Sequence, residues 1–439
     1  MVTDAVSERA RTEVSIPYGG RLLLTLAALA LYALGRFVPL PFVAMDVPDP
    51  SFSDRERISV VVLGITPLFL GFILVELFSL VTIPGHRLRQ SGAAGRFRLD
   101  RAALITGLLI AATQAMGIAI WLERMTKPDG FPLVPFPGLG FRLLTTLTLT
   151  AMTAALYSMG QFLSNYGIGN GFALLMLTKL VLSIGLSAIP GQGLQPQDFL
   201  VPVISILLAV GLAVLIFRFI RKAEDRWIPA FPQGIVPLSW SNSLVALLFA
   251  TPGLPRSPIT GVVLTLITIP VLSWLAFHLF SSRPRLYSNL SDPEELLDEL
   301  AVTLKRWMVP ATALLTLGTL VVLAWREYRP NPIAFAFDLG SLLMLVAIGL
   351  DLWDQYRFQR RVGATALLTQ LDNVHFSYRL EEKLQEEGID ALARGHQFRS
   401  LYFFFGALFK IDVLVPEEQL GRARSALAEL ETAREIRAF

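Results

Sequence analysis

Ten stretches of this chain are apolar and long enough to cross a lipid bilayer. A hydrocarbon core of about 30 Å needs about 20 apolar residues of helix. The 439-residue chain is 53% hydrophobic and only 17% charged, so it has too few charged groups to cover a soluble globule of its size. The sequence therefore predicts an all-α, multi-pass membrane protein with spans at 21–41, 59–82, 101–122, 141–164, 171–189, 199–219, 235–251, 259–280, 305–326 and 337–357.

The composition also limits the chemistry. The chain has no cysteine and four histidines, which excludes disulfides, a thiol nucleophile and thiolate metal sites. We therefore expect no catalytic residue, no metal, no cofactor and no enzymatic activity. The net charge of +3 is small, and the basic residues gather in particular loops. That pattern is typical of membrane topology and gives no reason to expect direct binding of nucleic acid.

Basic loops predict the orientation of the spans, because short loops rich in Lys and Arg stay in the cytoplasm. The loop after the first span carries more acidic than basic residues, and the loop after the fifth has no Lys or Arg. We expect a protein of the cytoplasmic (inner) membrane with both termini in the cytoplasm, and residues 1–18 do not resemble a cleaved signal peptide. The basic loops follow the second span (His86, Arg87, Arg89, Arg96, Arg98, Arg101) and the sixth (Arg221, Lys222, Arg226).

Two spans begin with a similar pentapeptide. Gly64-Ile-Thr-Pro-Leu68 and Gly234-Ile-Val-Pro-Leu238 lie 170 positions apart, and Leu74, Val75 and Leu77 recur in register as Leu244, Val245 and Leu247. Ten spans in two sets of five place these two helices in opposite directions, so the sequence predicts an inverted repeat whose site lies where the halves meet. Chance is the alternative, because these residue types are common in the chain.

Six segments, taken in order, resemble the signature segments of SecY, the channel subunit of the bacterial protein translocase. The resemblance covers about residues 19–357 and implies two five-helix halves around an hourglass pore, which opens across the membrane and sideways between the second and seventh helices. The Gly167-Ile-Gly-Asn-Gly171 run is the most specific piece. The segments are Arg21–Thr25 through Phe37–Pro41, Leu63–Pro67, Ala112–Ile118, Tyr166–Gly171, Gly234–Pro237, and Gly340–Leu343 with Asp351.

The resemblance also implies a pore ring. In the family, this collar of apolar side chains blocks ions at a constriction and yields to a peptide. Methionine suits a compliant collar, because its unbranched side chain adapts to varied partners. The alternative for Phe172 and Met176 is that they fill the core or face lipid. The family positions of the ring fall on Ile65, Phe69, Phe172, Met176, Ser239 and Met344.

A second set of residues is expected at the lateral gate. Gly and Pro near a helix start permit irregular backbone beside a cavity, although Pro is also an ordinary first-turn residue. Glu76 lies within its span, so it needs a partner, and Gln114 and Asn242 are candidates. The alternative is that Glu76 reaches water. The predicted gate residues are Gly64, Pro67, Glu76, Gln114, Gly234, Pro237 and Asn242.

The glycine-rich run between the fourth and fifth spans does not predict a phosphate site, because no strand precedes it and no Lys follows. We expect Gly167, Gly169 and Gly171 to permit a tight interhelical turn and Asn170 to cap the next helix.

Three loops depart from the family pattern. Residues 46–60 are too short for a normal plug helix, and the loop at 222–233 has little left of the long basic hairpin that SecA or a ribosome grips. Residues 291–300 predict an acidic amphipathic helix, which disfavours docking on ribosomal RNA, or else a solvated face without a partner. We therefore expect translocating polypeptides, the lipid bilayer and SecE-like and SecG-like subunits as partners, and little binding of SecA or ribosomes.

The last part of the chain differs in pattern. Residues 367–371, 376–387, 389–393, 410–416 and 417–431 predict strand, helix, strand, strand and helix. The segments Leu384–Ile389, Val413–Glu418 and Ala423–Leu427 resemble a small α/β signal-transducing domain without catalytic residues. We expect the aromatic run Phe403–Phe405 to fill its core or to dock it on the membrane.

The sequence thus predicts a cytoplasmic tail (1–18), two five-helix halves (19–190 and 191–361) and a soluble α+β domain (362–439). The preferred function is a specialised SecY-like channel that moves or inserts polypeptides. A secondary transporter or membrane sensor with a regulatory tail is an alternative, as is a non-conducting SecY relative that acts as a platform. A transporter usually has ionisable residues at matched positions of its halves. Because Glu76 matches Ala246, the channel is favoured.

Overall fold

The computed structural model describes residues 18–43, 58–90, 92–126, 130–187, 257–281, 308–310, 312–320, 339–371, 374–402 and 409–432, with single residues between 207 and 245 and at 302, 306 and 323. It forms two compact units, one of residues 16–182 and the other of residues 1–15 with 183–439. Each unit is described by itself below.

Helices build the first unit. They are α2 (Tyr18–Gly35), α4 (Thr66–Val81), α5 (Ile83–Gln90), α6 (Gly92–Glu123), α7 (Leu139–Tyr166) and α8 (Gly171–Ser187). Between α2 and α4 two segments of the chain are joined by backbone hydrogen bonds. The amide of Leu40 donates to the carbonyl oxygen of Ile58 (2.8 Å), and the amide of Val60 donates to that of Val38 (3.0 Å). These residues pack on Ala115, Ala119 and Phe141 of α6 and α7.

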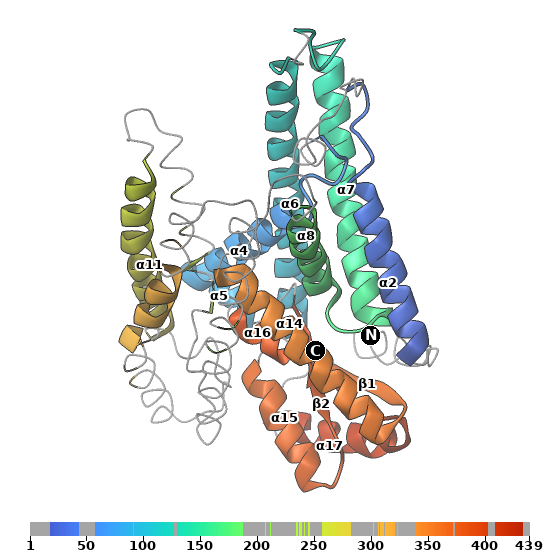
Figure 1. The fold of residues 1–439 in the computed structure, drawn as a ribbon. Helices are drawn as coiled ribbons and strands as arrows, with labels where there is room; N and C mark the ends of the chain where they lie inside the picture. Colours follow the sequence, from blue (N-terminus) through green and yellow to red (C-terminus); the bar gives the residue numbers. More distant parts are fainter. Residues whose placement is uncertain are drawn as a thin grey trace. The chain divides into compact units, whose positions relative to one another are not determined.

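The second unit combines helices with a small sheet. Its apolar helices are α11 (Pro258–Ser281) and α14 (Leu339–Val362). After α14 come β1 (Thr365–Leu371), α15 (Val374–Glu386), β2 (Leu392–Arg394), α16 (His396–Leu401), β3 (Ile411–Pro416), the 3₁₀ turn η3 (Glu417–Gln419) and α17 (Leu420–Thr432). The antiparallel sheet has the order β1-β3-β2, and the strands share a core with α15 and α17 around Leu380, Val413 and Ala423 (Figure 1).

The predicted α+β pattern of the C-terminal region is confirmed, with one addition. The sheet and its two longer helices follow the expected order, but the short helix α16 between β2 and β3 was not expected. Local sequence gives no N-cap for this helix: Gly395 precedes it with φ +83° and no side-chain capping bond. The side chain that closes it comes from α14, as described below.

The predicted spans contain helices where the structure describes most of their residues, but residues 36–41 and 59–65, which were predicted within spans, lie outside the helices. Helices α2, α4, α6, α7, α8, α11 and α14 lie on seven of the predicted spans, and Met308–Leu320 on an eighth. Spans 199–219 and 235–251 lie largely outside the described residues. Among the described helices, Tyr18–Gly35, Gly95–Glu123 and Leu139–Tyr166 are long and apolar enough to cross a membrane, so the count of ten stays a prediction.

Glycine allows α4 and α6 to approach closely. A Cβ atom on Gly71 would lie 2.3 Å from the backbone nitrogen of Gly107, and one on Gly107 would lie 2.7 Å from Cα of Leu68. Both distances are shorter than side chains tolerate, and the obstacle is backbone in each case. Small residues that let two backbones meet are the usual means of packing helices in a membrane.

We predict that Gly71→Ala destabilises the protein by about 1–3 kcal/mol, because the added methyl group pushes two helix backbones apart. Gly117→Ala on α6 is the matched control, since a Cβ there meets nothing within 4 Å. It should be neutral or stabilise by up to about 1 kcal/mol. Unfolding in mixed micelles of rising SDS content measures both free energies. Equal effects of the two substitutions would contradict the close contact.

Candidate functional site

The two copies of the pentapeptide share a backbone conformation. Gly64 has φ +57° and Gly234 has φ +51°, in the left-handed region that favours glycine. Pro67 follows in the first turn of α4, where backbone amides have no partner within the helix, so the missing N–H of proline costs no hydrogen bond. Pro237 is helical as well. This common geometry favours a true repeat over a chance match.

The predicted ring residues of the first unit lie on two helices. Ile65 caps α4 and Phe69 follows one turn later, both buried, whereas Met176 on α8 is half-buried. Phe172 packs against α7: its ring lies 5.6 Å from that of Tyr157, and a Cβ on Gly160 would strike it at 2.6 Å. These contacts fit the core-filling alternative, and a place for Phe172 in a ring stays a prediction.

The other two ring residues were predicted in the second half of the chain. Met344 is half-buried on α14, and its sulfur accepts a hydrogen bond of 2.9 Å from the hydroxyl of Tyr402. Ser239 lies outside the described residues, as does the predicted gate residue Asn242.

Glu76 forms a buried ion pair with a residue that sequence analysis had placed in a loop. Oε1 of Glu76 accepts a hydrogen bond of 2.8 Å from Arg96, and the hydroxyl of Ser79 donates to the main-chain oxygen of Glu76 (2.7 Å). The two side chains are 3% and 17% exposed. Because α6 begins at Gly92, Arg96 is helical and is held beside α4.

Gln114 was therefore wrong as the partner of Glu76. It lies 18 residues beyond Arg96 on the continuous helix α6, which is about 27 Å along the axis. One carboxylate cannot reach both positions. A carboxylate within a predicted span needs a cation or a hydrogen-bond network nearby, so the sequence indicated that Glu76 has a partner without identifying Arg96.

Five backbone amides at the turn between α7 and α8 donate hydrogen bonds to recorded partners. The amide of Gly167 donates to Leu163 (2.8 Å), that of Ile168 to the Thr25 hydroxyl of α2 (3.0 Å), and that of Gly171 to Ser164 (2.9 Å). Asn170 caps α8, with Oδ1 accepting from residues 172 and 173 at 3.0 and 3.1 Å. Gly169 has φ +62°. The run is a tight structural turn.

Asp351, which lies on α14, caps the N-terminus of α16. Its carboxylate oxygens accept hydrogen bonds from the amides of Gln397 (3.0 Å) and Phe398 (2.9 Å). The position of Asp351 near an end of the tenth predicted span favours an interfacial residue, whereas the structure buries it; nothing local predicts a partner 46 residues later.

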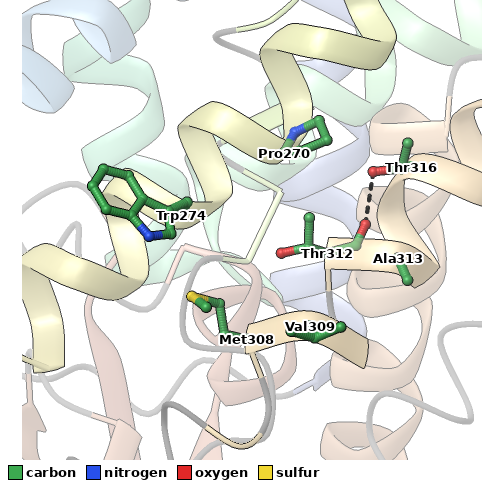
Figure 2. Close-up of a pocket in the computed structure, with 7 residues that line it drawn as sticks. All are labelled: Pro270, Trp274, Met308, Val309, Thr312, Ala313 and Thr316. Atoms are coloured by element: carbon green, nitrogen blue, oxygen red, sulfur yellow. Dashed lines mark hydrogen bonds between the residues drawn. The ribbon is translucent and has the colours of Figure 1, made fainter.

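One apolar pocket lies between α11 and the helical residues Met308–Leu320. Figure 2 shows Pro270 and Trp274 of α11 facing Met308, Thr312 and their neighbours. The cavity measures about 360 Å³. Its lining is apolar and lacks a charged group, so it suits an acyl chain or an apolar side chain and offers no catalytic chemistry. The lining residues are Pro270, Trp274, Met308, Val309, Thr312, Ala313 and Thr316.

Comparison with known proteins supports the resemblance found in the sequence. Residues 59–229 match the SecY family. The chain is 26% identical to the protein translocase subunit SecY of Rickettsia typhi over 48% of its own length and 53% of that protein, and 30% identical to SecY of Aquifex aeolicus over 37% and 42%. The chain spans about half the length of the first of these curated relatives.

Solved structures share the fold, and one of them is described as the structure of a protein conducting channel. It matches 79% of this chain and 93% of its own, with a TM-score of 0.50 and 13% identity. Likeness at that identity concerns the fold alone. The fold likeness and the sequence matches together support the similarity of this chain to SecY.

We predict that removing one partner of the Glu76–Arg96 pair costs about 3–5 kcal/mol, because the other charge stays buried and loses its ion-pair partner. The double variant Glu76→Ala with Arg96→Ala should lose clearly less unfolding free energy than the sum of the losses in the two single variants. Lys383 and Glu386 on α15, an exposed pair at 2.9 Å, serve as control, with a coupling of about 0–1 kcal/mol. A double-mutant cycle from unfolding measurements compares the two pairs. Additive effects at Glu76 and Arg96 would contradict the buried ion pair.

Proposed function

We propose that this protein is a SecY-like channel that moves polypeptides across a membrane or inserts them into it. The observation that carries the proposal is the match to SecY over residues 59–229, which includes the buried ring candidates Ile65, Phe69 and Phe172. The similar positive φ angles of Gly64 and Gly234 support a repeat with one copy in each half. We place the chain in the inner membrane with cytoplasmic termini.

A secondary transporter is the less favoured function. Its coupling carboxylate must bind a proton, ion or substrate during each cycle. Glu76 is the acidic residue that sequence analysis singled out within a span, and it is paired with Arg96. The pairing supports a structural role for this charge and therefore a channel.

Specialisation is a further part of the proposal. The short segments at 46–60 and 222–233 and the acidic residues of 291–300 leave less surface for a plug, for SecA and for a ribosome. SecE-like and SecG-like subunits remain expected partners.

Site-specific photo-crosslinking tests the channel. A photoreactive amino acid at Phe69 or Met344 should form adducts with a secretory chain stalled during transport, because both positions lie on the proposed path. Leu109 of α6 and Leu147 of α7 are the controls, since they are 64% and 68% exposed and carry no ring position. Adducts at all four positions alike, or at none in membranes that transport the chain, would contradict conduction through this site.

Binding of purified SecA tests the specialisation. We predict an affinity at least about tenfold lower than that of an ordinary SecY, a difference of about 1.4 kcal/mol, because the basic loop that SecA grips is short. Titration in nanodiscs at one salt concentration compares the two proteins. Equal affinities would refute the interpretation of the short loop.

A further inference from the structure

Helix α16 of the C-terminal domain is held by α14. It is only six residues long, and its own sequence supplies no side-chain cap. The buried carboxylate of Asp351 instead accepts the amides of Gln397 and Phe398. Such charge-assisted bonds at a helix N-terminus are strong and are favoured by the helix dipole. Figure 1 shows α16 beside α14.

The other end of α16 contacts two elements of the proposed channel. The hydroxyl of Tyr402 donates to the sulfur of Met344, a ring candidate. The carbonyl oxygen of Leu401 accepts the amide of Ile235 at 3.0 Å, beside the gate candidate Gly234. A Cβ on Gly234 would lie 1.8 Å from this oxygen, so the backbones meet here because position 234 is glycine.

Aromatic packing joins α16 to its own domain. The rings of Phe398 and Phe409 lie 4.8 Å apart and those of Tyr402 and Phe409 5.2 Å apart, and all three side chains are buried. Phe409 stands just before β3. Because of this packing, α16 and the sheet must move as one body.

We propose that the C-terminal domain is a built-in latch that holds the channel closed. Helix α16 ties α14 to the segment that starts at Gly234, and these contacts must break before a polypeptide passes. This inference rests on the proposed function, in which the pore opens beside the seventh helix. A segment that is bonded at its first turn to a fixed domain cannot move aside, so opening requires release of α16.

The chain has the geometry for such a release. Helix α14 ends at Val362 and β1 begins at Thr365, with Gly363 at φ +80° between them. A pivot at this glycine can swing the domain away while the sheet stays intact. At the surface, Arg361 and Asp390 form an ion pair at 2.7 Å that joins the end of α14 to the domain.

A reversible lock tests the latch. Because the natural chain has no cysteine, Arg361→Cys with Asp390→Cys can be joined specifically by a bis-maleimide whose spacer contains a disulfide. Transport of a secretory chain into proteoliposomes should fall at least about tenfold when the pair is joined, because the open state is depleted, and should recover when a reductant cuts the spacer. Lys383→Cys with Glu386→Cys, an exposed pair within α15, is the matched control and should transport equally before and after joining.

Release is the complementary experiment. Asp351→Ala removes both capping bonds, so the latched state loses stability relative to the open state, and transport should rise about tenfold. If α16 is only a structural brace, this variant should instead show lower transport and a lower melting temperature, and the joined Arg361–Asp390 pair should transport normally. Either result overturns the latch.

The same measurements distinguish failure of the latch proposal from failure of the proposed channel function. If the unjoined protein moves no polypeptide and gives no adducts at Phe69, the proposed function fails and the latch fails with it. If the unjoined protein moves polypeptide and the joined protein does so equally well, the latch alone is wrong.

Discussion

The need to satisfy backbone polar groups at helix ends determines how this protein is held together. A helix leaves its first amides and last carbonyls without internal partners, and lipid offers none. Here the partners come from side chains: Asn170 for α8, Thr25 of α2 for the turn before it, and Asp351 of α14 for α16. Glu123 of α6 accepts the amide of Gly138 just before α7 (2.8 Å) and also binds Arg142. Helix ends are therefore also the points at which separate helices are joined.

Much of this arrangement follows from local sequence rules. The apolar runs predict the helices, the short apolar segments 367–371 and 410–416 predict strands of the small sheet, and Asn170 in front of an apolar run predicts a cap. Each of these rules uses information within a few residues. For that reason they identify the described helices and strands, while the ends of the spans at 36–41 and 59–65 differ from the prediction.

The errors and omissions concern contacts between residues far apart in the chain. Arg96 looked like one basic residue of a cytoplasmic loop, because helix continuation to Gly92 could not be read from a polar stretch. Gly71 and Gly107 do not predict a contact by themselves, because their role is to let two helix backbones approach each other. Helix α16 is six residues long and depends on Asp351, so neither periodicity nor local capping could reveal it.

The two copies of the pentapeptide are anchored in different ways. The helix after Gly64 is fixed within the first unit, by the close contact of Gly71 with Gly107 and by the ion pair of Glu76 with Arg96. The second copy has Ala246 where the first has Glu76, so that position cannot make an equivalent pair. Its described start is instead bonded to Leu401 of the C-terminal domain. A helix that is held by its own buried ion pair stays in place. A helix that is bonded to the C-terminal domain can be freed when that domain moves. In the latch proposed above, the second copy is therefore the one that moves.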